Sequence, residues 1–187
     1  SIPGPTMKVR EGSEVTVDVV NDSDLETTVH WHGLRLENRY DGTHETQAPI
    51  PVGGSFSYRI RFPDPGVYWY HPHIREDYGQ ELGLYGNILV DAHEPDYWAP
   101  AHRQLLVTLD QPGIVHNLAG FFSSRGIDIA ELNTRSYAAG HTGAPMFAVQ
   151  MLVHVPAKVH IAALREEFMD LCDQLNLDAI LEPVKPQ

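Results

Sequence analysis

Alternating apolar and polar residues predict short strands throughout the first half of the chain. Residues 15–19 and 57–62 alternate strictly, and residues 67–71 and 86–90 form short, largely apolar runs. Period-two alternation is typical of half-buried strands. Turns rich in glycine and proline separate the runs, and no amphipathic helix is expected before about residue 113. The pattern predicts a Greek-key β-sandwich or barrel.

The periodicity changes from about residue 102. A buried strand is expected over residues 105–109, followed by a helix whose apolar stripe runs from Ile114 to Phe122 and which ends at Gly126. The later runs predict three more strands, over residues 127–137, 147–155 and 179–184. They also predict a second helix over residues 161–175. The order is βαββαβ, the ferredoxin-like arrangement. The fold class expected is therefore a β domain followed by an α/β domain.

Charge and cysteine content exclude some classes of function. The chain has 187 residues and a formal net charge of −12, which argues against direct binding of nucleic acid through a basic surface. No apolar run approaches the length of a membrane helix, so no membrane partner is expected. The single cysteine, Cys172, rules out an intrachain disulfide and lies on the apolar stripe of the second predicted helix.

Two His-x-His pairs are the candidate chemistry of the first half. His30 and His32 flank a tryptophan, and His71 and His73 flank a proline. Side chains at i and i+2 of a strand share one face, so each pair offers two neighbouring imidazoles. Imidazole suits copper, zinc, iron and nickel, and the four histidines are predicted to be metal ligands. The other seven histidines are interpreted as surface or loop residues; they are His44, His93, His102, His116, His141, His154 and His160.

The motifs around these pairs carry a resemblance. In order they are SIPGPT, VHWHGL, DGT, PDPGVYWYHPH and GLYG, at residues 1–6, 29–34, 41–43, 63–73 and 83–86. Together they make residues 1–109 resemble the first cupredoxin domain of laccase-like multicopper oxidases. The resemblance implies copper as cofactor and half of the eight histidines of a trinuclear site. It implies that His30 faces the type 2 copper and that His32, His71 and His73 face the type 3 pair.

The chain departs from that family pattern in two ways. It has no His-Cys-His segment, since Cys172 stands between leucine and aspartate, so the type 1 copper site and the other half of the trinuclear ligands are missing. The family's first strand, normally upstream of SIPGPT, is also missing, which implies an N-terminally truncated sandwich. The chain alone is therefore not expected to be a competent oxidase.

The second half resembles a different family. Residues 110–115 (DQPGIV), 122–129 (FSSRGIDI) and 142–147 (TGAPMF) make residues 103–185 similar to an ACT domain of the glycine cleavage system transcriptional repressor type. The resemblance implies an amino-acid ligand bound by Gly113, Ile114 and Val115, whose backbone N–H groups at a helix start suit a carboxylate. A simple strand-to-helix turn at these residues is the alternative.

Two domains are predicted, residues 1–102 and 103–187, with the boundary between 98 and 110. Three functions follow: a copper-binding oxidase fragment, an amino-acid-sensing ACT module with a passenger β domain, and a recombined or engineered chain without native activity. An exposed sheet edge in the first domain predicts a homo-oligomer. The hypothesis of an oxidase fragment also predicts a missing cupredoxin domain in trans. The oxidase half suggests an extracytoplasmic location, and the ACT half a cytoplasmic one.

Overall fold

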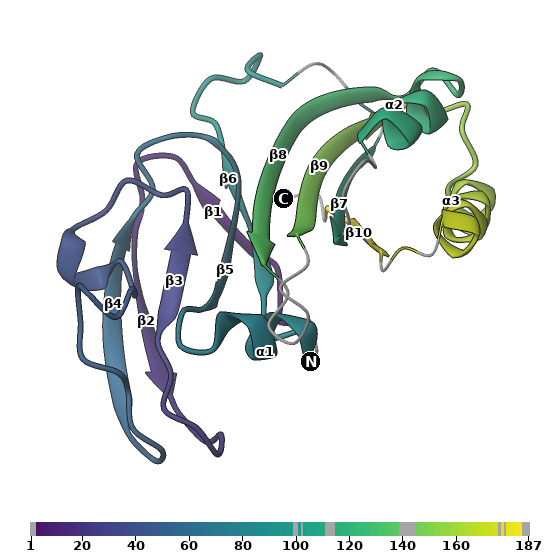
Figure 1. Ribbon diagram of the computed structural model, residues 1–187. Coiled ribbons are helices and arrows are strands. Elements are labelled where there is room, and N and C mark those ends of the chain that lie inside the picture. Colours follow the sequence, from purple (N-terminus) through teal and green to yellow (C-terminus); the bar gives the residue numbers. More distant parts are fainter. Residues whose placement is uncertain are drawn as a thin grey trace. The chain divides into compact units, whose positions relative to one another are not determined.

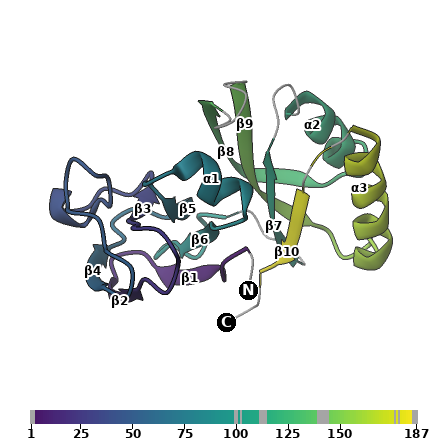
Figure 2. The same ribbon diagram turned by 60° about the horizontal axis from the view of Figure 1, so that its bottom comes forward.

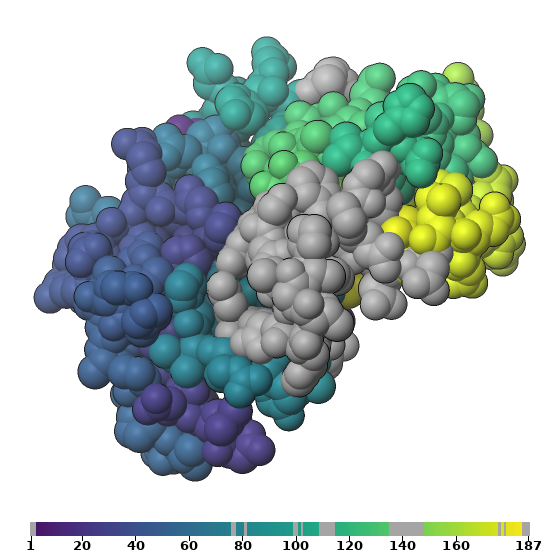
Figure 3. Space-filling view, in the orientation of Figure 1, coloured from purple at the N-terminus to yellow at the C-terminus, as the bar shows by residue number. Residues whose placement is uncertain are grey.

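The chain forms two compact units, Ser1–Glu94 and Pro95–Gln187. The computed structural model in Figure 1 describes residues 3–98, 101, 103–110, 115–138, 145–175, 177 and 179–184; the other positions are grey in Figure 3. Each unit is described by itself. The domain boundary predicted between residues 102 and 103 stays a prediction.

The first unit is a β-sandwich, as predicted. Its elements in chain order are β1 (Met7–Arg10), β2 (Glu14–Val20), β3 (Val29–His32), the 3₁₀ segment η1 (Asn38–Tyr40), β4 (Ser55–Arg61), β5 (Gly66–Pro72), α1 (Glu76–Glu81) and β6 (Gly86–Asp91). One sheet has the order β1-β6-β5-β3, and β2 pairs with β4 in the other. The expectation of no helix before residue 113 is wrong at α1. A helix of six residues is less than two turns long, too short to show a helical period.

The two faces of the larger sheet in this unit differ in chemistry. Trp31 of β3, Tyr68 and Tyr70 of β5, and Ile88 of β6 belong to the core between the two sheets. Since side chains alternate along a strand, His30, His32 and His71 lie on the opposite face of the same sheet. The strands that build the core therefore also present the histidines on their outer face.

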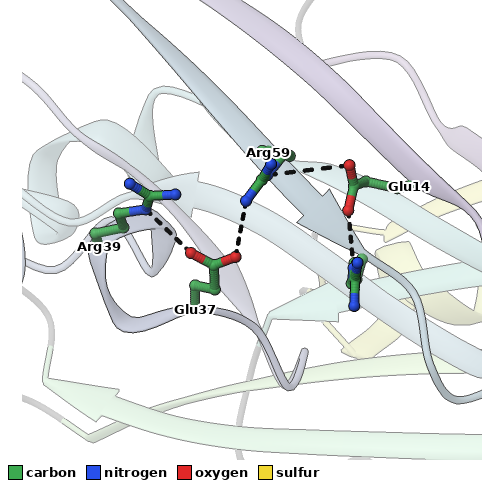
Figure 4. Close-up of polar contacts among 5 residues, drawn as sticks. Glu14, Glu37, Arg39 and Arg59 are labelled. Carbon is green, nitrogen blue, oxygen red and sulfur yellow. Dashed lines mark hydrogen bonds and ion pairs between the residues drawn. The ribbon is translucent and has the colours of Figure 1, made fainter.

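Exposed charges join β2, β4 and η1 on the surface of the first unit. Figure 4 shows Arg59 between two carboxylates: its Nη2 lies 3.0 Å from Glu37, and its Nε lies 4.0 Å from Glu14. Arg39 contacts the other oxygen of Glu37 at 3.1 Å. The hydrogen bond from Arg59 lowers the pKa of Glu37. Because these groups face solvent, we expect them to contribute little to stability.

The second unit has the predicted order βαββαβ. Its elements are β7 (Arg103–Asp110), α2 (Val115–Ser123), β8 (Asp128–Ala138), β9 (Pro145–Val155), α3 (Ile161–Leu175) and β10 (Ala179–Pro183). The sheet has the order β10-β7-β9-β8. Figure 2 shows both helices against this sheet. No helix in the described part of the chain is long and apolar enough to cross a bilayer.

The core of the second unit joins both helices to one face of the sheet. Phe122 of α2 and Phe168 of α3 are fully buried and stack with ring centroids 5.8 Å apart. Cys172 belongs to the same core, as its place on the apolar stripe predicted. Burial raises the pKa of its thiol to about 11. The thiol is therefore protonated at neutral pH and serves as a packing group.

Candidate metal centre

The pairing of β3 with β5 brings the two His-x-His motifs together. The register places His30 directly opposite His71, and His32 opposite Trp69. Directly opposed residues on one face of an antiparallel pair have Cβ atoms about 4.5–5.5 Å apart. His73 follows β5 directly after Pro72. We call His30, His32, His71 and His73 the histidine tetrad.

The nitrogens of the tetrad are close enough to share metal ions. One ligand atom from each of His30, His32 and His71 can be chosen so that all lie within 4.8 Å of one another. The His73 ring lies outside this group of three, with its centroid 5.3 Å from that of His30. Metal–nitrogen bonds of about 2.0 Å place two nitrogens on one ion about 3–4 Å apart. The spacing therefore fits a cluster of ions, or one ion after small side-chain shifts.

Burial and aromatic packing hold the tetrad in place. His71 is fully buried, and the ring of Trp69 packs against it at 4.3 Å between centroids. On the other face, the Tyr58 hydroxyl accepts a hydrogen bond of 2.9 Å from the Val29 N–H, directly before His30. Burial raises the pKa of Tyr58. Trp69 therefore serves as a packing group that fixes the position of the His71 ring.

Asp41 orients His30. The Nδ1 atom of His30 lies 2.7 Å from the Asp41 carbonyl oxygen and 3.4 Å from its carboxylate. In the tautomer with a proton on Nδ1, the ring donates to this carbonyl and keeps the Nε2 lone pair for a metal. The next residue, Gly42, has φ +82°, and an added Cβ would collide with the Val29 backbone. Only glycine lets the loop approach β3 closely enough for this contact.

His71 has two partners at its Nδ1 atom. The Pro72 carbonyl lies at 2.9 Å and the Gln80 side-chain nitrogen at 3.1 Å. One nitrogen cannot donate to the first and accept from the second, so these contacts belong to alternative tautomers. A metal at Nε2 requires the proton on Nδ1 and selects the contact with Pro72. In that tautomer the Gln80 side-chain nitrogen, which is also a donor, cannot hydrogen-bond to Nδ1.

Asp41 and Gln80 were missed as site residues by sequence reasoning. The signal for Asp41 was present in the DGT motif at residues 41–43, although its contact with His30 was not predicted. Gln80 is on α1, a helix that the sequence did not predict. Its contact with His71 could therefore not be inferred from the strand pattern.

The histidines outside the tetrad fall into three groups. The surface interpretation is confirmed for His44, His93, His116 and His160. It is wrong for His154, which is 4% exposed and lies in β9, one of the two inner strands of its sheet. His154 was interpreted as a surface or loop residue because it belongs to no His-x-His pair, whereas it lies inside β9 beside Gln104. His102 and His141 lie outside the described residues.

The candidate ligand loop of the second unit is largely outside the described residues. This applies to Gly113 and Ile114. Val115 is the first residue of α2 and is partly buried against the core of the second unit. Ligand binding by these three residues stays a prediction.

Comparison with known proteins finds similarity over the first half of the chain. Residues 1–95, just over half of the sequence, match the family described as multicopper oxidase. Multicopper oxidase MmcO of Mycobacterium tuberculosis is 45% identical over 112 residues, which are 59% of this chain and 21% of that protein. Copper resistance protein A of Pseudomonas syringae pv. tomato is 36% identical over 96 residues, 51% of this chain and 15% of that protein. The chain thus spans about a fifth or less of the length of these relatives.

Solved structures agree with the sequence comparison. A multi-copper oxidase from Pseudomonas Parafulva is 38% identical, covers 55% of this chain and 26% of its own, and has a TM-score of 0.50. A multi-copper oxidase from Pseudomonas Thermotolerans covers 83% of this chain and 52% of its own, with 22% identity and a TM-score of 0.54. The first likeness supports a cupredoxin-like sandwich, and the second concerns the fold alone.

Proposed function

The chain belongs to the multicopper oxidase family, and from this premise we propose that its first unit binds copper through the histidine tetrad and supplies half of a trinuclear copper site. The observation that carries the proposal is the convergence of His30, His32 and His71, whose nitrogens lie within 4.8 Å. Imidazole nitrogens are suitable ligands for copper. The relatives named above are a multicopper oxidase and a copper resistance protein.

Each histidine has a proposed place in the site. His30 faces the type 2 copper, and the other three members of the tetrad face the type 3 pair. In such a site copper supplies the capacity to take up electrons and pass them to dioxygen. The protein's own part is to orient the rings: the Asp41 carbonyl fixes the tautomer of His30, and the Pro72 carbonyl that of His71.

The remaining ligands are proposed to come from outside these 187 residues. The sequence contains no His-Cys-His segment, and its one cysteine is buried in the second unit. A further cupredoxin domain, in trans or elsewhere in a longer chain, would have to supply the type 1 copper and four more histidines. These 187 residues are therefore proposed to bind copper without oxidase activity of their own.

Copper content tests this proposal. The full chain is loaded with copper, separated from free metal and measured by elemental analysis and electron paramagnetic resonance. We expect copper in stoichiometric amount, and loss of that copper in His32→Ala and His73→Ala. His93→Ala, an exposed histidine after β6, is the matched control. Copper content that is the same in all four proteins would refute tetrad binding.

A second candidate function concerns the second unit. Its order βαββαβ and sheet order β10-β7-β9-β8 are compatible with the proposed ACT domain. In that case Gly113, Ile114 and Val115 would bind the carboxylate of an amino acid. A thermal shift measured with each of the common amino acids tests this, because a ligand that binds only the folded form raises apparent stability. A recombined chain without native activity predicts neither copper binding nor any such shift.

Self-association is also proposed. In the first unit, β1 and β3 are the edge strands of the larger sheet. The edge strand of a sheet can pair with an edge strand of a second copy of the chain. Sedimentation velocity at several protein concentrations tests the proposal, and a monomer at every concentration contradicts it.

A further inference from the structure

His44 stands beside the tetrad without belonging to it. It follows the Asp41–Gly42 turn that orients His30, and its side chain is 56% exposed. By comparison, the side chain of His30 is 15% exposed and His71 is fully buried. The five rings therefore run from the exposed His44 to the buried His71.

The spacing between His44 and His73 matches the spacing within the tetrad. Their ring centroids lie 6.0 Å apart. Within the tetrad, the distances between ring centroids run from 5.3 Å for His30 and His71 to 6.1 Å for His71 and His73. The pair of His44 and His73 thus has the separation of rings that we propose to share copper ions. His73 is the member common to both groups.

Glu45 prepares the His44 ring for metal binding. Its carboxylate oxygen lies 2.8 Å from the Nε2 atom of His44. A neutral ring that donates its Nε2 proton to this carboxylate keeps the lone pair on Nδ1. A carboxylate on the second ring nitrogen is the arrangement found behind many metal-ligating histidines, where it fixes the tautomer and raises the basicity of the ligand.

We propose that His44 and His73 form an outer copper site, through which a copper ion enters the tetrad from solvent. The inference rests on the proposed function, since it assigns the entry point of the same ions. With two imidazoles and open positions for water, the outer site binds copper more weakly than the tetrad. An ion held there can exchange one histidine at a time, with His73 as the shared ligand.

The test uses the metal-free full chain mixed with Cu²⁺ alone. Rapid freeze-quench electron paramagnetic resonance follows copper uptake, and elemental analysis after removal of weakly bound metal gives the final content. His44→Ala is expected to reach the same final content as the natural chain. Its uptake should be slower by on the order of tenfold, the lower end of the gain in on-rate that local concentration of an ion can give. Glu45→Gln should slow uptake less.

His93→Ala is the matched control, because His93 is also an exposed histidine of the first unit. Its uptake rate is expected to equal that of the natural chain. Equal uptake rates for His44→Ala and the natural chain would overturn the outer site. The proposed function would still be supported in that case if the natural chain holds copper that His32→Ala loses. A natural chain that retains no copper dependent on His32 overturns both.

Discussion

Two histidines of this chain are almost equally buried and yet differ in chemistry. His71 of the first unit is 0% exposed and His154 of the second unit is 4% exposed. His71 has two further histidine rings, those of His30 and His32, within 5.8 Å. His154 has Gln104, whose side-chain nitrogen lies 3.2 Å from Nε2, and Trp98 at a ring distance of 6.4 Å.

The neighbours, more than the burial, decide what each ring can do. Burial lowers the pKa of His154, and the opposed Asp128 of β8 counteracts this only in part. The Gln104 amide donates to Nε2, a bond that only the neutral ring can accept. His154 is therefore a neutral structural group. In the first unit the imidazoles face one another, and a cation between them would satisfy several lone pairs at once.

The largest effect on stability is expected from a core substitution that tests whether the two units behave independently. Phe122→Ala removes a fully buried ring from the second unit and is expected to cost it about 3–5 kcal/mol. Because the tetrad is built on β3 and β5 of the first unit, the copper content of the folded chain should not change. Chemical denaturation and elemental analysis measure the two quantities. Loss of tetrad copper in Phe122→Ala would contradict the independence of the two units.

The comparison between the two histidines can be tested directly with copper. His71→Ala is expected to weaken copper binding by at least about 100-fold, since even the loss of a ligand's hydrogen-bond partner costs 10–100-fold. His154→Ala should leave the affinity unchanged. Competition with a chelator of known affinity provides the measurement. Equal losses in the two variants would mean that burial, and not the neighbouring rings, controls the copper affinity.

A smaller effect is expected from the turn that orients His30. Gly42→Ala forces the loop away from the Val29 backbone and moves the Asp41 carbonyl, so copper affinity should fall by about 10–100-fold. Gly53→Ala is the control, because Gly53 also has a positive φ, +74°, but an added Cβ meets nothing within 4 Å. Both variants carry similar backbone strain. Equal copper affinity in Gly42→Ala and Gly53→Ala would exclude a role of the Asp41 carbonyl in orienting His30.

The smallest effect is the pH dependence that His154 confers. Its folded pKa is lowered, so the unfolded chain binds the proton more readily. The stability from neutral His154 is fully present above the unfolded pKa of about 6.5 and is lost as pH falls below it. One proton changes the unfolding equilibrium by at most about tenfold per pH unit. Denaturation from pH 7.5 to 5 should show this slope, and His154→Gln should reduce it.

Local patterns predicted most elements of both units. The alternation of residues 15–19 and 57–62 became β2 and β4, and the helical stripe of residues 161–175 became α3. The prediction was poorest where an element is short or where its environment comes from elsewhere in the chain. The six residues of α1 are too few to show a helical period. The neighbours of His154 are Gln104 and Trp98, which are about 50 residues away in the sequence.

The sequence by itself determined which residues share a face. The i, i+2 spacing places His30 beside His32 because of backbone geometry alone. Only the tertiary structure decided that β3 pairs with β5 in the register that sets His30 against His71. It also brought Asp41, Gln80 and His44 to these rings. Periodicity is a property of neighbouring residues, whereas register and loop approach depend on contacts between distant ones, and a single residue's slip would turn every histidine of one strand to the other face.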